Sequence, residues 1–117
     1  MASSSEWGRV GERAAADEYE RRGYELLDRN FRAAGAEIDL ILTKDGQVIF
    51  AEVKMRRGTA FGMGHEAVTP AKAGRIRRAA AAFLERHRLD ESEVRFDVAS
   101  LTLIKGSLTM EIFEDCF

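Results

Sequence analysis

The strongest constraint on the fold is a pair of strand-like segments that meet at one tight turn. Residues 37–43 (EIDLILT) and 47–55 (QVIFAEVKM) are rich in aliphatic and β-branched residues, and Asp45-Gly46 lies between them. An Asp-Gly pair between two such segments is typical of a two-residue hairpin turn. The sequence therefore predicts two adjacent antiparallel strands that are apolar enough to lie inside a sheet.

Charged residues interrupt both of these apolar strands. Side chains two residues apart share one face of a strand, so Glu52 and Lys54 are expected to point the same way. The hairpin brings Asp39 alongside them. A charge on an interior strand is costly unless it is paired or bound, which favours a functional site here. For the tripeptide Glu52-Val53-Lys54 alone, an exposed ion pair on an amphipathic strand is the ordinary alternative.

Two helices are expected to flank these strands. The first covers residues 7–22 and ends at Gly23, because a glycine commonly caps a helix C-terminus. The second begins at Thr69-Pro70, an N-cap hydroxyl followed by proline at the first helical position, and runs to about Arg88. The first helix has an apolar stripe at helical spacing that consists of Val10, Ala14, Ala15 and Tyr19.

Further strands are expected at residues 24–29, 95–104 and 108–113, with a loop at 56–68 rich in glycine and small residues. The predicted fold is α/β, with a mixed central β-sheet flanked by helices in the order α-β-β-β-α-β-β. A chain of 117 residues is enough for one hydrophobic core, so we expect a single domain over residues 1–117, with 1–6 as a flexible lead.

The acidic pair suggests a metal site. Mg²⁺ takes oxygen ligands and usually accepts one or two protein carboxylates, leaving positions for water and a substrate phosphate. Asp39, Glu52 and the carbonyl of Val53 are the expected ligands of Mg²⁺ or Mn²⁺. Such a metal activates water and polarises a phosphodiester, while Lys54 orients the water or stabilises developing negative charge.

Positive charge is concentrated in the second half of the chain. The net charge is −2, yet residues 54–88 hold nine basic and two acidic residues, a local charge of +7. Clustered positive charge attracts phosphates whatever the total charge is, although a solvated helix face gives the same pattern. The expected nucleic-acid-binding residues are Arg56, Arg57, Lys72, Arg75 and Arg78.

Six phrases in this order and spacing resemble the YraN-like family of uncharacterised bacterial proteins, and the resemblance runs from Gly8 to about Ala99. The phrases are GRVGERAAADEY, RRGYELLDRNFR, EIDLI, VIFAEVKMR, FGMGHEAVTPAK and RFDVA. One departure from the family pattern is Ala36, which stands where the family usually has glycine, with Gly35 beside it.

The resemblance implies a restriction-endonuclease-like PD-(D/E)XK fold, with a distant similarity to archaeal Holliday-junction resolvases. The positions that match the family's acidic and lysine positions are Glu12, Asp39, Glu52 and Lys54. Glu12 enters the candidate catalytic set through this resemblance, because its own helix is rich in exposed charge. The resolvase similarity also implies branched DNA as a substrate and a homodimer.

Three functions are compatible with these patterns. The first is a Mg²⁺-dependent nuclease that hydrolyses phosphodiester bonds of DNA; the second is a nucleic-acid-binding module without catalysis; the third is an adaptor whose basic helix binds an acidic protein. The sequence has no apolar stretch of about 18 residues, no signal-peptide pattern and a single cysteine, Cys116. We therefore expect a cytoplasmic protein that does not span a membrane.

Overall fold

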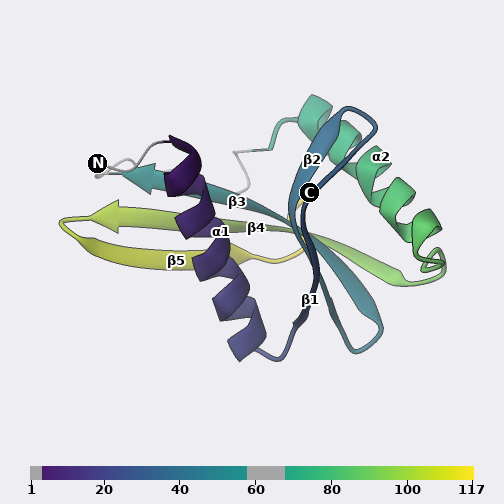
Figure 1. Cartoon of the computed structure of the whole chain (residues 1–117), viewed down its shortest axis with the longest axis horizontal. Helices are drawn as coiled ribbons and strands as arrows, with labels where there is room; N and C mark the ends of the chain where they lie inside the picture. The colour runs from purple at the N-terminus through teal and green to yellow at the C-terminus, as the bar shows by residue number, and fades with distance from the viewer. Residues whose placement is uncertain (1–3, 58–67) are drawn as a thin grey trace.

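A computed structural model describes residues 4–57 and 68–117 of the chain as an α/β fold in which two helices flank one five-stranded sheet (Figure 1). The element order is α-β-β-β-α-β-β, as predicted. The elements are α1 (Ser4–Arg21), β1 (Glu25–Ala33), β2 (Ala36–Lys44), β3 (Gln47–Arg57), α2 (Pro70–Arg86), β4 (Glu93–Ile104) and β5 (Ser107–Phe113).

The sheet order follows the chain, β1-β2-β3-β4-β5, with β3 and β4 parallel and the other neighbours antiparallel. Each antiparallel pair is closed by a two-residue turn whose second member is a glycine. The turns are Ala34-Gly35, Asp45-Gly46 and Lys105-Gly106, and all six residues have positive φ. This is the requirement of the hairpin turn that matches the twist of the strands, so turn chemistry fixes the register of β1, β2 and β5.

The two helices cover opposite faces of the sheet (Figure 1). Along β3, Ile49 and Ala51 pack with Tyr19 of α1, whereas Val48 and Phe50 pack with Phe83 of α2. This alternation was predicted and is confirmed. Within the described ranges, no helix is long and apolar enough to cross a membrane.

The predicted apolar stripe of α1 is wrong at Val10, which is 47% exposed. The helix instead approaches β3 through Gly11, where an added Cβ would lie 2.6 Å from Sδ of Met55. Because the line of closest approach passes through Gly11 and the fully buried Ala15, Val10 turns outward. The helix also begins at Ser4, inside the predicted lead, of which residues 1–3 lie outside the described part.

Two features of the strands differ from simple alternation and from the predicted loop bounds. Ile38 packs with Phe31 and Ile41 in the α2-side cluster, although strict alternation puts it with Leu40 on the α1 side. The strand therefore departs from strict alternation next to Asp39. In addition, β3 extends to Arg57, so the first two residues of the predicted loop are strand, and residues 58–67 lie outside the described part.

Candidate active site

Asp39 and Glu52 meet where the ladder between β2 and β3 ends. Paired register runs from Lys44–Gln47 to Leu40–Ala51 and stops there. Beyond the Leu40–Ala51 pair, the side chains of Asp39 and Glu52 accept hydrogen bonds from main-chain N–H groups of the opposite strand. The main-chain N–H of Val53 donates to Oδ2 of Asp39 at 2.8 Å, and the main-chain N–H of Asp39 donates to Oε2 of Glu52 at 3.4 Å. The two carboxylates are thus held together by reciprocal contacts across the strands.

Glu52 is buried and Asp39 is half-buried, and the charges of the two carboxylates repel each other. Glu52 is 7% exposed, and burial, followed by the nearby Asp39 carboxylate, raises its pKa to about 8. Burial raises the pKa of Asp39 to about 6; the N–H of Val53 opposes this rise, and the charges of Glu12 and Glu37 add to it. The pair therefore resists carrying two negative charges at neutral pH, which is the condition that a bound cation relieves.

The cation nearest to this pair comes from α2. Nζ of Lys72 lies 3.6 Å from Oε1 of Glu52. Thr69 caps the helix by accepting a hydrogen bond from the N–H of Lys72, which sets the first turn of α2 beside β3. A hollow of about 320 Å³ opens over the pair, and its lining consists of Gly35, Ala36, Glu37, Asp39, Glu52, Lys72, Arg75 and Ile76.

Glu12 is connected to the site through a residue that the sequence analysis missed. Nδ2 of Asn30 donates to Oε1 of Glu12 at 3.1 Å and lies 3.4 Å from Oε1 of Glu37. Asn30 has φ +52°, a left-handed conformation that asparagine tolerates better than most residues. An asparagine inside a strand-like segment was therefore the signal that the sequence offered. Glu37 forms an ion pair with Arg32, whose Nε lies 2.6 Å from Oε2 of Glu37.

Lys54 shares the β3 face of Glu52 but is exposed, and it forms no ion pair with Asp39 or Glu52 among the residues described. The predicted convergence of two carboxylates and an ammonium therefore occurs with a different lysine, Lys72. Arg56 and Arg57, further along β3, do not join the carboxylates either. The guanidinium of Arg57 lies over the ring of Trp7 at 4.3 Å. Nε of Arg56 is buried and has no hydrogen-bond partner among residues 4–57 and 68–117.

The outer face of α2 carries the other predicted phosphate-binding residues. Arg75 and Arg78 are both exposed, and Arg75 also lines the hollow above the carboxylates. Arg77 has a different role, because it lies over the ring of Phe96 and donates to the main-chain oxygen of Phe117. The cationic face that reaches from the hollow along α2 thus consists of Lys72, Arg75 and Arg78.

The donor set is incomplete as a metal cage. In the described part of the chain, no group of three or more His, Cys, Asp or Glu side chains is arranged to hold a metal ion. Asp39 and Glu52 form a pair, and Glu12 and Glu37 lie farther out, where they act on Asp39 through their charge. A metal here would take two carboxylates and complete its shell with main-chain oxygen, water or substrate.

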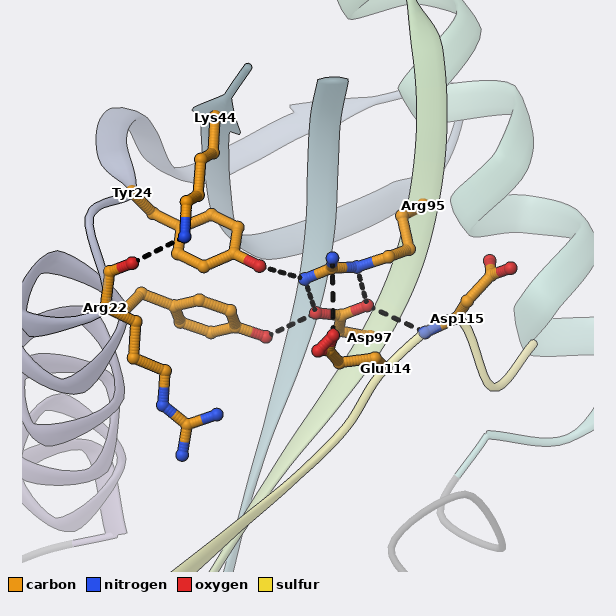
Figure 2. Close-up of polar contacts among 8 residues, drawn as sticks. Arg22, Tyr24, Lys44, Arg95, Asp97, Glu114 and Asp115 are labelled. Atoms are coloured by element: carbon orange, nitrogen blue, oxygen red, sulfur yellow. Dashed lines mark hydrogen bonds and ion pairs between the residues drawn. The ribbon is translucent and has the colours of Figure 1, made fainter. Parts of the chain in front are cut away.

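A second polar cluster surrounds the fully buried Asp97 of β4 (Figure 2). Oδ1 of Asp97 accepts from Nε of Arg95 and from the main-chain N–H of Asp115, both at 2.9 Å. Oδ2 accepts from Nη2 of Arg95 and the hydroxyl of Tyr19, both at 2.8 Å. Arg95 also donates to the hydroxyl of Tyr24 at 2.9 Å.

The Asp97 cluster is structural. It lies on the α1 side of the sheet, since Asp97 pairs in register with Ala51, whereas Glu52 faces α2. With no exposed surface on Asp97, it gives a substrate no access, and it ties α1, β4 and the segment after β5 together. The sequence analysis missed it, although an Asp inside the apolar phrase RFDVA is the kind of signal that singled out Glu52.

Comparison with known proteins identifies one family. The pattern of an uncharacterised protein family, UPF0102, matches residues 11–101. A UPF0102 protein of Syntrophomonas wolfei is 42% identical over 101 residues, which cover 86% of this chain and 88% of the relative. One from Syntrophus aciditrophicus is 35% identical over 117 residues, covering 100% and 92%, and one from Frankia alni is 45% identical over 98 residues, covering 84% and 82%.

Proposed function

This chain belongs to the UPF0102 family, and we propose a function for it from the site itself: a Mg²⁺-dependent nuclease that hydrolyses phosphodiester bonds of DNA. The YraN-like resemblance pointed to the same family, whose name states no activity. One observation carries the proposal. The half-buried Asp39 and the buried Glu52 are held against each other on neighbouring strands with raised pKa values, in a hollow that Lys72 and Arg75 also line. Holding two repelling carboxylates together, one of them buried, costs stability unless they bind a cation.

The residues present fit a divalent cation. Oδ1 of Asp39 and both carboxylate oxygens of Glu52 are potential metal ligands of the kind that hard cations prefer. The N–H of Val53 points toward β2, and in a strand the carbonyl of a residue lies on the same side as its N–H. The carbonyl of Val53 is therefore directed toward Asp39 beyond the end of the ladder, where it can complete an all-oxygen donor set.

The order of elements supports a restriction-endonuclease-like PD-(D/E)XK assignment within the observed α/β fold. The acidic residues come from β2 and β3, with Glu52 and Lys54 two apart on one strand, and Glu12 comes from the preceding helix. The distant similarity to archaeal Holliday-junction resolvases that the family resemblance implies would extend the proposal to branched DNA and to a homodimer.

The residues of the chain would divide the work. A bound Mg²⁺ would supply an activated water and polarise the phosphodiester. Lys54, exposed on the same strand face as Glu52, would donate to the water or to the developing charge. The cationic face of α2, with Arg75 and Arg78, would hold the DNA backbone, because guanidinium groups bind phosphate oxygens bidentately.

A nucleic-acid-binding module without catalysis is the second candidate. The observation in its favour is the donor set, since the described residues offer no metal site with three acidic, His or Cys ligands. On this alternative, the ion pair between Lys72 and Glu52 is permanent, and the cationic face of α2 binds phosphates alone.

The deciding experiment is cleavage of labelled linear, flapped and four-way DNAs in Mg²⁺ or Mn²⁺, with EDTA and Glu52→Gln as controls. We expect wild-type cleavage that EDTA and Glu52→Gln both abolish. Glu111→Gln is the matched control, because this exposed glutamate lies on the edge strand β5, outside the site. Binding of these DNAs without any cleavage would replace the nuclease with the binding module.

A further inference from the structure

The main chain of Lys72 is held in place by the first turn of α2, whereas its side-chain ammonium is free to move. Its N–H is held by Oγ1 of Thr69 at 3.2 Å, and the N–H of Ala73 donates to the carbonyl of Thr69 at 2.8 Å. The buried Ala73 and Ile76 anchor the same turn of α2 in the core. The side chain of Lys72 is nevertheless 45% exposed, so four flexible bonds separate a rigid main chain from a solvent-facing charge.

The contact that this ammonium makes is electrostatic and loose. The Nζ to Oε1 distance of 3.6 Å is longer than the 2.7–2.9 Å typical of a charge-assisted hydrogen bond. The side chain of Glu52, in contrast, is only 9% exposed, so it stays in place when the Lys72 ammonium moves into solvent. The contact thus joins the buried carboxyl group of Glu52, which is held in place, to the half-exposed ammonium of Lys72, which can move.

No other cation in the described ranges takes this position. Lys54 shares the strand face of Glu52, and Arg75 lines the same hollow, yet neither forms an ion pair with Asp39 or Glu52. Lys72 therefore offsets the charge of the carboxylate pair through direct contact, and its charge favours the ionised form of both acids.

Building on the proposed metal site, we propose that Lys72 is a tethered counter-cation of the Asp39–Glu52 pair, which a divalent metal must displace in order to bind. Lys72 then sets the affinity of the site for metal and is not simply one of the phosphate contacts of the α2 face, as we had expected from the sequence. A cation inside the same protein competes with the metal at an effective concentration that dilution cannot lower.

The test is calorimetric titration of the full chain with Mg²⁺ and with Mn²⁺, without nucleic acid. Lys72→Met keeps the apolar stem and removes the charge, so we expect it to bind metal about two- to fivefold more tightly than wild type, the upper part of the range of a partly exposed ion pair. Lys72→Arg retains a cation and should stay within about twofold of wild type. Arg78→Met, which removes the same charge from the exposed face of α2, should also change the affinity by less than about twofold.

Thermal unfolding of the same variants separates this role from a structural one. Lys72→Met should lower the metal-free melting temperature, and the rise caused by Mg²⁺ should be larger than in wild type. If wild type binds metal and Lys72→Met binds equally or more weakly, the counter-cation role is overturned and the metal site stands. Binding by Lys72→Met alone would support the role. If neither protein binds metal, this inference and the metal-dependent function fail together.

Discussion

The main-chain N–H of Val53 donates to Oδ2 of Asp39 at 2.8 Å, so a side chain occupies the position that a β2 carbonyl would hold in a longer ladder. A carboxylate that replaces main-chain pairing is fixed in orientation by the sheet itself. The same break in the ladder leaves room for Glu52 to reach the N–H of Asp39. The candidate site is therefore built into the end of a strand pair, where main-chain hydrogen bonds hold both carboxylates.

Metal binding should depend on both carboxylates. Asp39→Asn and Glu52→Gln each remove one charged ligand, and we expect either to weaken Mg²⁺ binding at least about tenfold in calorimetry. In wild type, metal at about 100 times its dissociation constant should add about 2.7 kcal/mol to the free energy of unfolding. Equal affinity in wild type and Asp39→Asn would remove the metal site from consideration.

The metal-free protein should become less stable as pH rises from about 4 to about 8. The pKa of Asp39, about 6, and that of Glu52, about 8, exceed their unfolded values of 3.8 and 4.5. In this window the folded state binds more protons than the unfolded state, so stability is full at the acid end and declines as pH increases. Each such proton contributes a slope of up to about 1.4 kcal/mol per pH unit.

Glu52→Gln isolates this effect from all other titrating groups. The variant cannot ionise at that position, so the difference in stability between it and wild type should favour the variant increasingly toward pH 8. Urea unfolding at pH 5 and pH 8 measures the difference. Parallel pH profiles for the two proteins would mean that Glu52 ionises normally in the folded state.

Asp97→Ala should be severely destabilising, by about 3–5 kcal/mol, because it removes the fully buried partner of the Arg95 guanidinium, whose side chain is only 13% exposed. Glu114→Gln is the matched control, since Glu114 also pairs with Arg95, at 3.4 Å, but its side chain is 50% exposed. We expect less than about 1 kcal/mol from that change. Urea denaturation at pH 7 compares the two, and similar losses would contradict the structural role assigned to Asp97.

The sequence was sufficient for the features that depend on local pattern. The Asp45-Gly46 turn sets the register between β2 and β3, and that register places Asp39 beside Glu52. Alternation then assigns the buried residues of β3 to the two faces. Thr69-Pro70 likewise determines where α2 begins.

The features that the sequence did not reveal depend on how distant elements dock. Lys72 reaches Glu52 only because α2 lies across this face of the sheet, and helical periodicity places Lys72 merely outside the apolar stripe. Asn30 meets Glu12 across 18 positions through a left-handed residue in a strand. The partner of Asp97, Tyr19, is 78 positions away, and no local pattern encodes that distance.

Arg75 and Arg78 should contribute to DNA binding through phosphates rather than bases. Each phosphate neutralised on duplex DNA adds about 0.9 to the slope of log K against log salt, so Arg75→Ala with Arg78→Ala should reduce that slope by up to about two. Fluorescence anisotropy between about 50 and 200 mM salt measures it. Arg88→Ala, after the end of α2, is a control that removes one positive charge outside this face and should leave the slope nearly unchanged. A wild-type slope in the double variant would leave Arg75 and Arg78 as a solvated face.

Lys54 should matter for rate and not for folding or affinity. Its side chain is exposed and pairs with neither carboxylate, so Lys54→Ala should change the free energy of unfolding by no more than about 0.5 kcal/mol. If Lys54 stabilises charge that develops only in the transition state, its loss should slow cleavage by about 10²- to 10³-fold, as removal of one such donor does elsewhere. Binding of the same DNA in Ca²⁺ should change only a few-fold, because the cationic face of α2 supplies most of the ground-state attraction. Single-turnover cleavage and anisotropy on one substrate give both values. If Lys54→Ala cleaves at the wild-type rate, Lys54 does not stabilise the transition state, and Lys72, whose ammonium lies 3.6 Å from Oε1 of Glu52, becomes the candidate for that role.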